Sequence, residues 1–342
     1  MGGAKGRAVA AVFAVLLAAA VSRYPFEGTV LGPVLLAYAG LLCWRPVLWL
    51  ALLPALLPVL DLAPWTGWFF LEEIDLLLLV TAAVGYWRPD AGAGAARAAL
   101  PRAVRHAAAL VSLALALALW RAMTPWPQAD LNAFATYQSG WNGVRTAKGW
   151  LWALILLPLL RRDAGPALER LRSHFFPGML AGLALVALAA GAERIAFPGL
   201  LNMASDYRTS APFSAMHTGG AALDGYLSLC LPLLAPWLAG PSGRLRTTVA
   251  LALLAAAAYA GLTTFSRTLY LAFGVSALLL WALHRPAPTP RQRALAALAL
   301  VLAASALTLV FSAGGYRGLA AAMLVLCAAG WLATRGLGWR DA

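Results

Sequence analysis

The residues best suited to chemistry lie in one polar stretch, residues 192–224, between two long apolar runs. It contains Glu193, Arg208, His217 and Asp224. Ionisable side chains are costly near a bilayer and are usually retained there for a function. A neutral imidazole can take a proton from a hydroxyl group near pH 7, and a guanidinium can bind a phosphate through its planar fork. The stretch therefore predicts a functional loop of a membrane enzyme. Taken alone, His217 could equally be a histidine held by a structural hydrogen bond in the loop.

Basic residues beside the ends of several apolar runs form a second candidate group. Several guanidinium groups on one side of a membrane could bind a phosphate or pyrophosphate. The alternative for each is a side chain that reaches the headgroups or pairs with a carboxylate. The functional interpretation is favoured for Arg267, because it lies in a turn with almost no loop, where a charge costs about 2.5–3.5 kcal/mol near mid-bilayer. The group consists of Arg145, Lys148, Arg208, Arg267 and Arg317.

An acidic patch opens the apolar run at residues 70–86. Glu72 and Asp75 are three residues apart, which places both on one side of a helix. They could act as a base, a proton relay or metal ligands, but counter-ions for the outer arginines are the preferred interpretation. The outer segments offer one histidine and no cysteine to complete a metal site. We therefore expect no metal and no other cofactor.

The composition indicates what kind of protein presents these residues. Of the 342 residues, 62% are hydrophobic and only 11% are charged, whereas soluble domains average about 25% charged residues. The chain is therefore predicted to be an all-α, polytopic transmembrane helical bundle, a single integral membrane domain over residues 1–342. The net charge of +13 does not indicate nucleic-acid binding, because most Lys and Arg residues lie in short turns between apolar runs.

Apolar runs of roughly 15–20 residues predict about twelve membrane spans in the lipid bilayer. With the N-terminus inside, 18 of the 26 basic residues fall on the cytoplasmic side, so both termini are predicted to be cytoplasmic. The longest outer segments are then residues 122–148 and 193–220. The first run resembles a signal peptide, but an uncleaved anchor is preferred because more spans follow at once. The runs are residues 8–22, 29–43, 46–62, 70–86, 106–121, 149–160, 178–192, 221–238, 247–264, 268–283, 294–311 and 319–334.

Two sequence motifs on the predicted outer side are similar to those of a known family. One is Asn202-Met-Ala-Ser-Asp-Tyr-Arg208, followed by Phe213-Ser-Ala-Met-His217 and a span. The other is Thr263-Thr-Phe-Ser-Arg-Thr-Leu-Tyr-Leu-Ala272, a Ser-Arg turn and the helix that follows it. Their order, spacing and outer placement resemble the O-antigen ligase/polymerase family of bacterial membrane proteins. The resemblance covers about residues 60–320.

This resemblance implies a metal-independent glycosyltransferase with a multi-helix, glycosyltransferase C-like fold in the bacterial inner membrane. Such enzymes transfer a glycan from undecaprenyl pyrophosphate to an acceptor glycan or lipid A core at the periplasmic face, in cell-surface polysaccharide biosynthesis. By position, Arg208 and Arg267 would handle the pyrophosphate. His217 is the candidate general base, and Arg145, Lys148, Arg317 and Asp224 are candidates for substrate binding.

One departure from the family pattern leaves the base open. Ligases of this family usually carry a large late periplasmic segment with a histidine that helps to activate the acceptor. Here the corresponding outer turn spans only residues 312–318, and no histidine follows His284. Either His217 or an acidic residue is then the base, or the chain is truncated or divergent and inactive. A non-catalytic export or flippase-type protein that binds the same lipid carrier is the alternative function.

Overall fold

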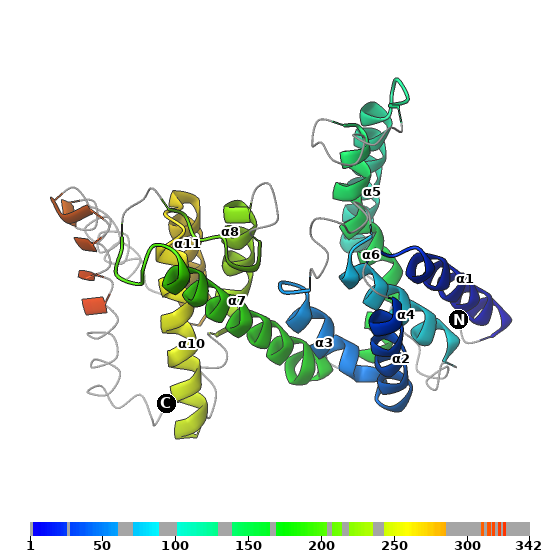
Figure 1. The fold of residues 1–342 in the computed structure, drawn as a ribbon, viewed down its shortest axis with the longest axis horizontal. Helices are drawn as coiled ribbons and strands as arrows, with labels where there is room; N and C mark the ends of the chain where they lie inside the picture. The colour runs from blue at the N-terminus through cyan, green and yellow to red at the C-terminus, as the bar shows by residue number, and fades with distance from the viewer. Residues whose placement is uncertain are drawn as a thin grey trace. The chain divides into compact units, whose positions relative to one another are not determined.

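The structure, a computed structural model, consists of helices and connecting turns, with no strand in the residues that it describes (Figure 1). Apolar sequence in a membrane favours helices because every backbone N–H and C=O must be paired internally. The predicted all-α class is confirmed for this part of the chain. The described residues are 3–25, 28–60, 71–88, 101–128, 139–164, 169–203, 207–213, 219–234, 243–284 and short pieces between 309 and 325.

The chain divides into two compact units, residues 1–182 and 183–342. The helices that lie within the first unit are α1 (Ala4–Ser22), α2 (Gly28–Trp44), η1 (Pro46–Leu48), α3 (Trp49–Leu56), α4 (Glu73–Trp87), α5 (Arg102–Ala122), α6 (Trp141–Asp163) and η3 (Leu171–Phe175). The next helix, α7 (Phe176–Ala196), begins in the first unit and ends in the second. The second unit continues with η4 (Ala211–Phe213), α8 (Gly219–Cys230), η5 (Leu231–Leu233), α10 (Arg244–Leu262) and α11 (Arg267–His284).

Five described helical segments are long and apolar enough to cross a membrane, or six if α2 and the bent segment after it form one span. The five are α1, α5, α6, η3 with α7, and α10. This supports a membrane protein but does not reach the predicted number of about twelve spans. The predicted spans at residues 294–311 and 319–334 lie mostly outside the described residues.

The predicted span at residues 46–62 differs from a straight crossing helix. Arg45 leaves helical geometry, with φ −130° and ψ 85°, and the chain resumes at Pro46 in a direction bent by 119° from α2. Proline lacks an N–H and disfavours helical geometry at the residue before it, so α2 ends here. The helix that follows ends at Leu56, which makes this segment too short to cross a bilayer alone.

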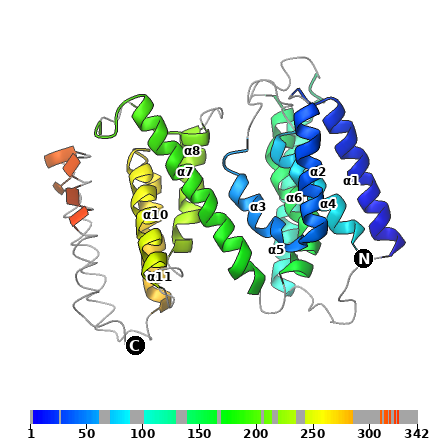
Figure 2. The ribbon, with the colours of Figure 1, turned by 60° about the horizontal axis from the view of Figure 1, so that its bottom comes forward.

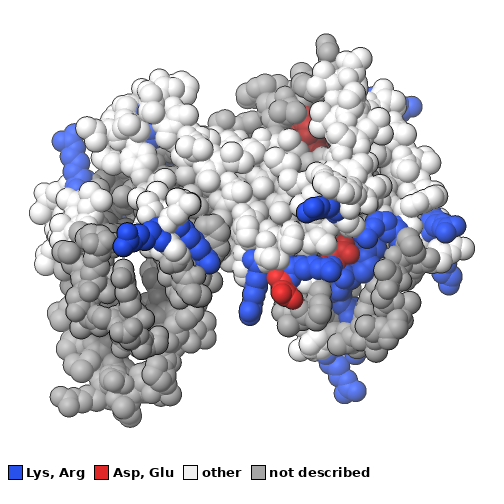
Figure 3. All heavy atoms as spheres, turned by 90° about the horizontal axis from the view of Figure 1, so that it is seen from below, with Lys and Arg blue, Asp and Glu red and all other residues white. Residues whose placement is uncertain are grey.

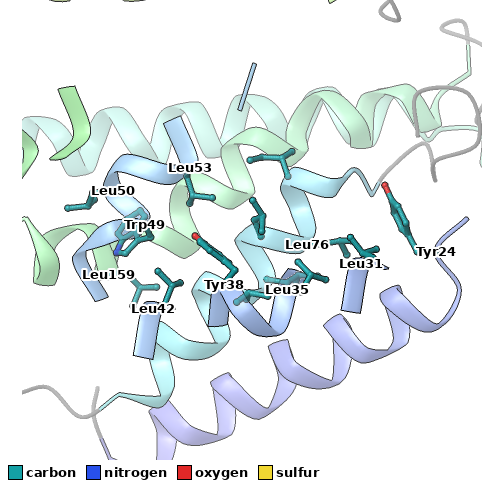
Figure 4. Close-up of a cluster of buried hydrophobic side chains, with 14 residues drawn as sticks. Tyr24, Leu31, Leu35, Tyr38, Leu42, Trp49, Leu50, Leu53, Leu76 and Leu159 are labelled. Atoms are coloured by element: carbon teal, nitrogen blue, oxygen red, sulfur yellow. The ribbon is translucent and has the colours of Figure 1, made fainter. Parts of the chain in front are cut away.

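The core of the first unit is formed by apolar side chains of α2, α3, α4 and α6. Leu35 and Leu42 of α2, Trp49 of α3 and Leu159 of α6 each expose at most 7% of their surface, and they converge around α4 (Figure 4). A Cβ atom on Gly85 of α4 would lie 2.5 Å from a methyl group of Leu159. The glycine therefore permits the close approach of α4 and α6.

A polar network ties α3, α4 and α6 together at the C-terminal end of α6. The buried carboxylate of Asp163 accepts hydrogen bonds from Trp49 Nε1 at 3.0 Å and from Arg162 Nε at 2.8 Å. Arg162 also donates through Nη1 to the carbonyl oxygen of Gly85 at 2.6 Å. Arg162 therefore links α6 to α4 directly and to α3 through the carboxylate of Asp163.

In the second unit, α8, α10 and α11 pack against one another (Figures 1 and 2). A Cβ atom on Gly261 would lie 2.9 Å from the ring of Phe273, so this glycine lets α10 and α11 approach closely. The two helices are joined by residues 263–266. This tight connection is the turn that presents Arg267.

The surface of the described residues suits a hydrocarbon environment. Most described atoms in Figure 3 belong to uncharged residues. α5 has no buried residue, and Leu110, Leu113 and Leu117 are each more than half exposed. A continuous apolar face of this kind is rare on soluble proteins. The exposed leucines are therefore consistent with contact to lipid.

Candidate functional site

Two segments that are distant in sequence meet in the second unit. Arg208 Nε donates a hydrogen bond to the carbonyl oxygen of Thr264, 56 residues away, at 2.8 Å. The backbone N–H of Thr209 donates to the carbonyl oxygen of Thr263 at 3.2 Å. Thr209, Thr263 and Thr264 are all fully buried. The loop that carries Arg208 is therefore fixed to the turn before α11.

This turn places Arg267 at the first position of α11. Ser266 Oγ accepts a hydrogen bond from the N–H of Leu269 at 3.4 Å, as an N-cap residue does. The exposed Arg267 side chain makes no hydrogen bond or ion pair with another described residue. The unpaired N–H groups and the dipole of a helix start also favour an anion. The guanidinium of Arg267 and the start of α11 therefore both raise the positive electrostatic potential at this end of the helix.

Arg208 lies beside Asp224 of α8. Its Nη2 is 3.7 Å from Asp224 Oδ2, and 53% of the arginine side chain and 15% of the aspartate side chain are exposed. This separation is longer than a hydrogen bond, and partly exposed ion pairs contribute little stability. Arg208 is thus anchored through Nε, while its outer nitrogens keep donors available for a ligand.

Glu193, near the end of α7, organises the loop on which Arg208 lies. Its carboxylate accepts the backbone N–H groups of Ser210, at 3.1 Å, and Ala211, at 2.5 Å. These groups lie at the start of η4, where N–H groups lack partners within the helix. Glu193 also accepts the hydroxyl of Tyr207 at 3.0 Å. Burial and this hydrogen bond raise the pKa of Tyr207, so the hydroxyl remains a donor at neutral pH.

Arg194, the neighbour of Glu193, is fully buried. Its Nη2 donates to the carbonyl oxygens of Asn202 and of Gly199, the latter at 3.3 Å. Gly199 has a φ of +87°, a conformation that favours glycine, just after α7 ends. Arg194 therefore closes the loop after α7 instead of presenting its charge at the surface.

Backbone strain marks both segments of the site. Ala211 and Phe265 have φ values of 52° and 53°, and no other non-glycine residue in the described ranges has a positive φ. Such conformations cost about 1–3 kcal/mol each and occur often at functional sites. Phe265 directly follows Thr264, and Ala211 is two residues after Thr209. The surrounding contacts, including the bond from the Ala211 N–H to Glu193, hold the strained backbone in place.

In the first unit, the predicted acidic patch pairs with a lysine. Lys148 Nζ lies 2.7 Å from Asp75 Oδ2 and 3.1 Å from Glu72 Oε2. Asp75 is 1% exposed and also accepts hydrogen bonds from Trp152 Nε1, at 2.7 Å, and from the N–H of Glu72, at 2.8 Å. Glu72 and Asp75 together form a capping box at the start of α4. The positive partner of these carboxylates is therefore a lysine of α6, whereas the sequence predicted arginines.

The outer segment predicted at residues 122–148 is partly helical. α6 begins at Trp141, so Arg145 and Lys148 belong to a helix and not to a loop. The hydropathy of this stretch is too low to predict a membrane span, so the sequence predicts a loop there. In the helix, the charge of Lys148 is neutralised by the carboxylates at the start of α4. Residues 129–138 lie outside the described residues.

The residues predicted for one site are distributed over both units. Half-buried Arg145 and Lys148 lie in the first unit, whereas Arg208, Asp224 and Arg267 lie in the second. The structure brings Arg208 close to Asp224 and bonds Arg208 to the turn that carries Arg267. Of the remaining candidates, Arg317 is exposed in a short helical piece of the second unit, and His217 lies outside the described residues.

No specific role was predicted for Glu193 or Trp152, or for the two carbonyl groups of the turn before α11. A carboxylate at the end of an apolar run was a visible signal for Glu193, but backbone carbonyls carry no sequence signal. Within the described ranges, no group of three or more His, Cys, Asp or Glu side chains is placed to hold a metal ion.

Comparisons with known proteins give no relative of this chain. No family model, no curated protein and no solved structure matches it. The functional argument therefore depends on the residues of the chain and on their geometry.

Proposed function

We propose that the chain is a glycosyltransferase similar to the O-antigen ligases and polymerases. It transfers a glycan from undecaprenyl pyrophosphate to an acceptor sugar at the periplasmic face of the bacterial inner membrane. The observation that carries this proposal is the contact between the loop bearing Arg208 and the turn bearing Arg267. These are the two segments in which the sequence resembles that family.

The two arginines suit a pyrophosphate leaving group. Negative charge develops on the pyrophosphate as the glycosidic bond breaks, so a fixed guanidinium stabilises the transition state more than the bound substrate. Arg208 is fixed by its bond to Thr264, and Arg267 stands at the start of α11. Donor groups that are positioned before the substrate arrives cost no reorganisation during the reaction.

The surroundings of the loop suit a lipid-linked substrate. Phe197 and Leu201, which lie between α7 and Arg208 in sequence, are 72% and 88% exposed. A polyprenyl chain that lies in the bilayer could contact such side chains while its phosphates reach Arg208. The proposal includes a glycosyltransferase C-like bundle of about twelve spans with both termini in the cytoplasm, which the distribution of basic residues supports.

The proposal is tested by deleting the gene and identifying the lipid-linked glycan that accumulates. We expect an undecaprenyl pyrophosphate-linked glycan that is cleared by the wild-type gene but not by an Arg208→Ala, Arg267→Ala double variant at equal abundance. Arg244→Ala, an exposed change at the other end of α10, is the matched control and should clear the glycan. Accumulation of no lipid-linked glycan would contradict the proposal.

A second measurement separates transfer from transport. A glycosyltransferase releases free undecaprenyl pyrophosphate and a lengthened acceptor, whereas a flippase-type protein only relocates the intact lipid-linked glycan. Purified protein in liposomes should therefore release the free carrier when donor and acceptor are both present. Relocation of the donor without release would favour the flippase-type alternative.

A further inference from the structure

We propose that Asp224 is the general base that deprotonates the acceptor hydroxyl. This inference rests on the proposed function, and it assigns the role that the sequence left open between His217 and an acidic residue. It depends on a comparison of the carboxylates that the structure describes around the two arginines. Two carboxylates lie there, those of Glu193 and Asp224, and their surroundings differ.

The carboxylate of Glu193 is fully used in holding the loop. It accepts hydrogen bonds from the N–H groups of Ser210 and Ala211 and from the hydroxyl of Tyr207. A carboxylate offers about four lone-pair sites, and these three donors together with the Ser210 hydroxyl, at 3.4 Å, make four donors to Glu193. Taking a proton there would also break the hydrogen bonds that position Arg208. Glu193 therefore positions the site and does not serve as its base.

The carboxylate of Asp224 accepts no hydrogen bond from another described residue. Oδ1 is buried and has no partner. Oδ2 has no hydrogen bond with a described residue and lies 3.7 Å from Arg208 Nη2, and 15% of the aspartate side chain is exposed. A carboxylate with open lone pairs can accept the hydrogen of a sugar hydroxyl. The nearby guanidinium places this oxygen beside the group that would hold the leaving pyrophosphate.

The carboxylates at the start of α4 are less suited to this role. Asp75 and Glu72 are paired with Lys148. Glu73 has two carboxylate oxygens without a partner, but both are buried and the residue is only 2% exposed. A bulky glycan acceptor cannot reach such a group. Of these acids, Asp224 alone combines an unpaired oxygen, partial exposure and a neighbouring arginine.

The proposed step is balanced as a single displacement. The oxygen of the acceptor hydroxyl attacks the anomeric carbon of the donor, and its proton passes to Asp224 Oδ2. The bond between the anomeric carbon and the pyrophosphate oxygen breaks, and its electron pair leaves with the undecaprenyl pyrophosphate. Arg208 and Arg267 stabilise the charge that develops on that leaving group. General base catalysis contributes about 10²–10⁴-fold to such reactions.

The test removes the proposed base and then supplies azide, a nucleophile that carries no proton and therefore needs no general base. Asp224→Ala should lower transfer by about 10²–10⁴-fold, measured with undecaprenyl pyrophosphate-linked glycan extracted from the deletion strain. Sodium azide should restore release of undecaprenyl pyrophosphate and yield a glycosyl azide, because azide attacks without losing a proton. Leu229→Ala, an exposed change on the same helix, is the control and should need no azide.

Binding of farnesyl pyrophosphate distinguishes the failure of this inference from the failure of the proposed function. Asp224→Asn should bind this probe at least as tightly as the wild type, since a negative charge beside Arg208 is removed, and binding also shows that the variant is folded. Arg208→Ala should weaken binding by about tenfold or more. If the wild type neither binds the probe nor transfers glycan, the proposed function fails.

Three results would overturn the assignment of Asp224 and leave the proposed function in place. The first is azide rescue of His217→Ala but not of Asp224→Ala, which makes the histidine the base. The second is an Asp224→Ala variant that binds farnesyl pyrophosphate normally and stays inactive with azide. The third is an Asp224→Ala variant that transfers glycan at the wild-type rate.

Discussion

At the scale of single residues, Arg208 and Arg267 differ in how much of their hydrogen-bonding capacity the protein already uses. Arg208 donates a hydrogen bond from Nε to the carbonyl oxygen of Thr264 and lies near Asp224. Arg267 is exposed and makes no such contact within the described residues, although a charge near a membrane usually acquires a partner. Its free donors and its place at a helix start are what an anionic ligand requires. Arg267 is therefore the residue whose substitution tests the site most directly.

We expect Arg267→Ala to be nearly inactive and Arg267→Lys to be strongly impaired. The lysine keeps the charge but loses the bidentate fork. Loss of one contact to a developing negative charge costs roughly 3–4 kcal/mol, or about 10²–10³ in rate. Transfer is measured at matched protein levels, with Arg244→Ala as the control. An arginine that merely reaches the headgroups would be replaced by lysine without loss, and such a result would remove Arg267 from the site.

Lys148 is expected to serve stability, because its ammonium group neutralises the buried carboxylate of Asp75. Removing one partner of a buried ion pair costs about 3–5 kcal/mol, and the 20% exposure of the Lys148 side chain places the expected loss at or below the lower end of this range. Lys148→Ala should therefore lower the melting temperature in detergent clearly, whereas Leu151→Ala, an exposed change on α6, should change it little. An unchanged melting temperature together with lost transfer would instead support the substrate-binding role that the sequence predicted.

At the scale of elements, the site is built where the end of α7, η4 and the α10–α11 turn meet. The sequence motifs predicted which segments would be important because their polar residues interrupt apolar runs. They did not predict how the segments join, since the joining bonds go to the carbonyl groups of Thr263 and Thr264. Nor did they predict Lys148 as the partner of Asp75, because 73 residues separate the two.

Glu193 links the end of α7 to the loop that carries Arg208, so Glu193→Ala should loosen this loop. The N–H groups of Ser210 and Ala211 would lose their charged acceptor, worth about 1.5–3 kcal/mol per hydrogen bond. Hydrogen–deuterium exchange of these two amides should accelerate by about ten- to a hundredfold. Glu169→Ala, an exposed acid elsewhere, is the control. Unchanged exchange at both amides would show that other contacts hold the loop.

At the scale of the whole molecule, hydropathy predicted the helical class because a bilayer permits little else. It was less informative about helix ends and about the number of crossings. The α2–α3 bend follows from Pro46. A hydropathy average over many residues does not register the effect of a single proline. The predicted run at residues 149–160 misses the start of α6 at Trp141, because polar residues in the first two turns of α6 lower the hydropathy of that stretch.

The orientation in the membrane decides whether the site can meet a periplasmic substrate. α10 has 19 residues, about 28 Å at 1.5 Å per residue, which nearly matches a hydrocarbon core of about 30 Å. If α10 crosses the bilayer as the proposal requires, Leu245, at its start, and the turn before α11, at its end, are expected at opposite membrane surfaces. Leu201 precedes the Arg208 loop that is bonded to this turn.

We therefore expect Leu201→Cys, at a position 88% exposed, to react with an impermeant thiol reagent in intact spheroplasts. Leu245→Cys, at a position 78% exposed, should react only after lysis. Both variants are made in a background in which Cys43, Cys230 and Cys327 are replaced by alanine. The reverse labelling pattern would place Arg208 and Arg267 on the cytoplasmic side, where a periplasmic acceptor sugar is absent. It would contradict the proposed transfer, even though the contacts within the site would be unchanged.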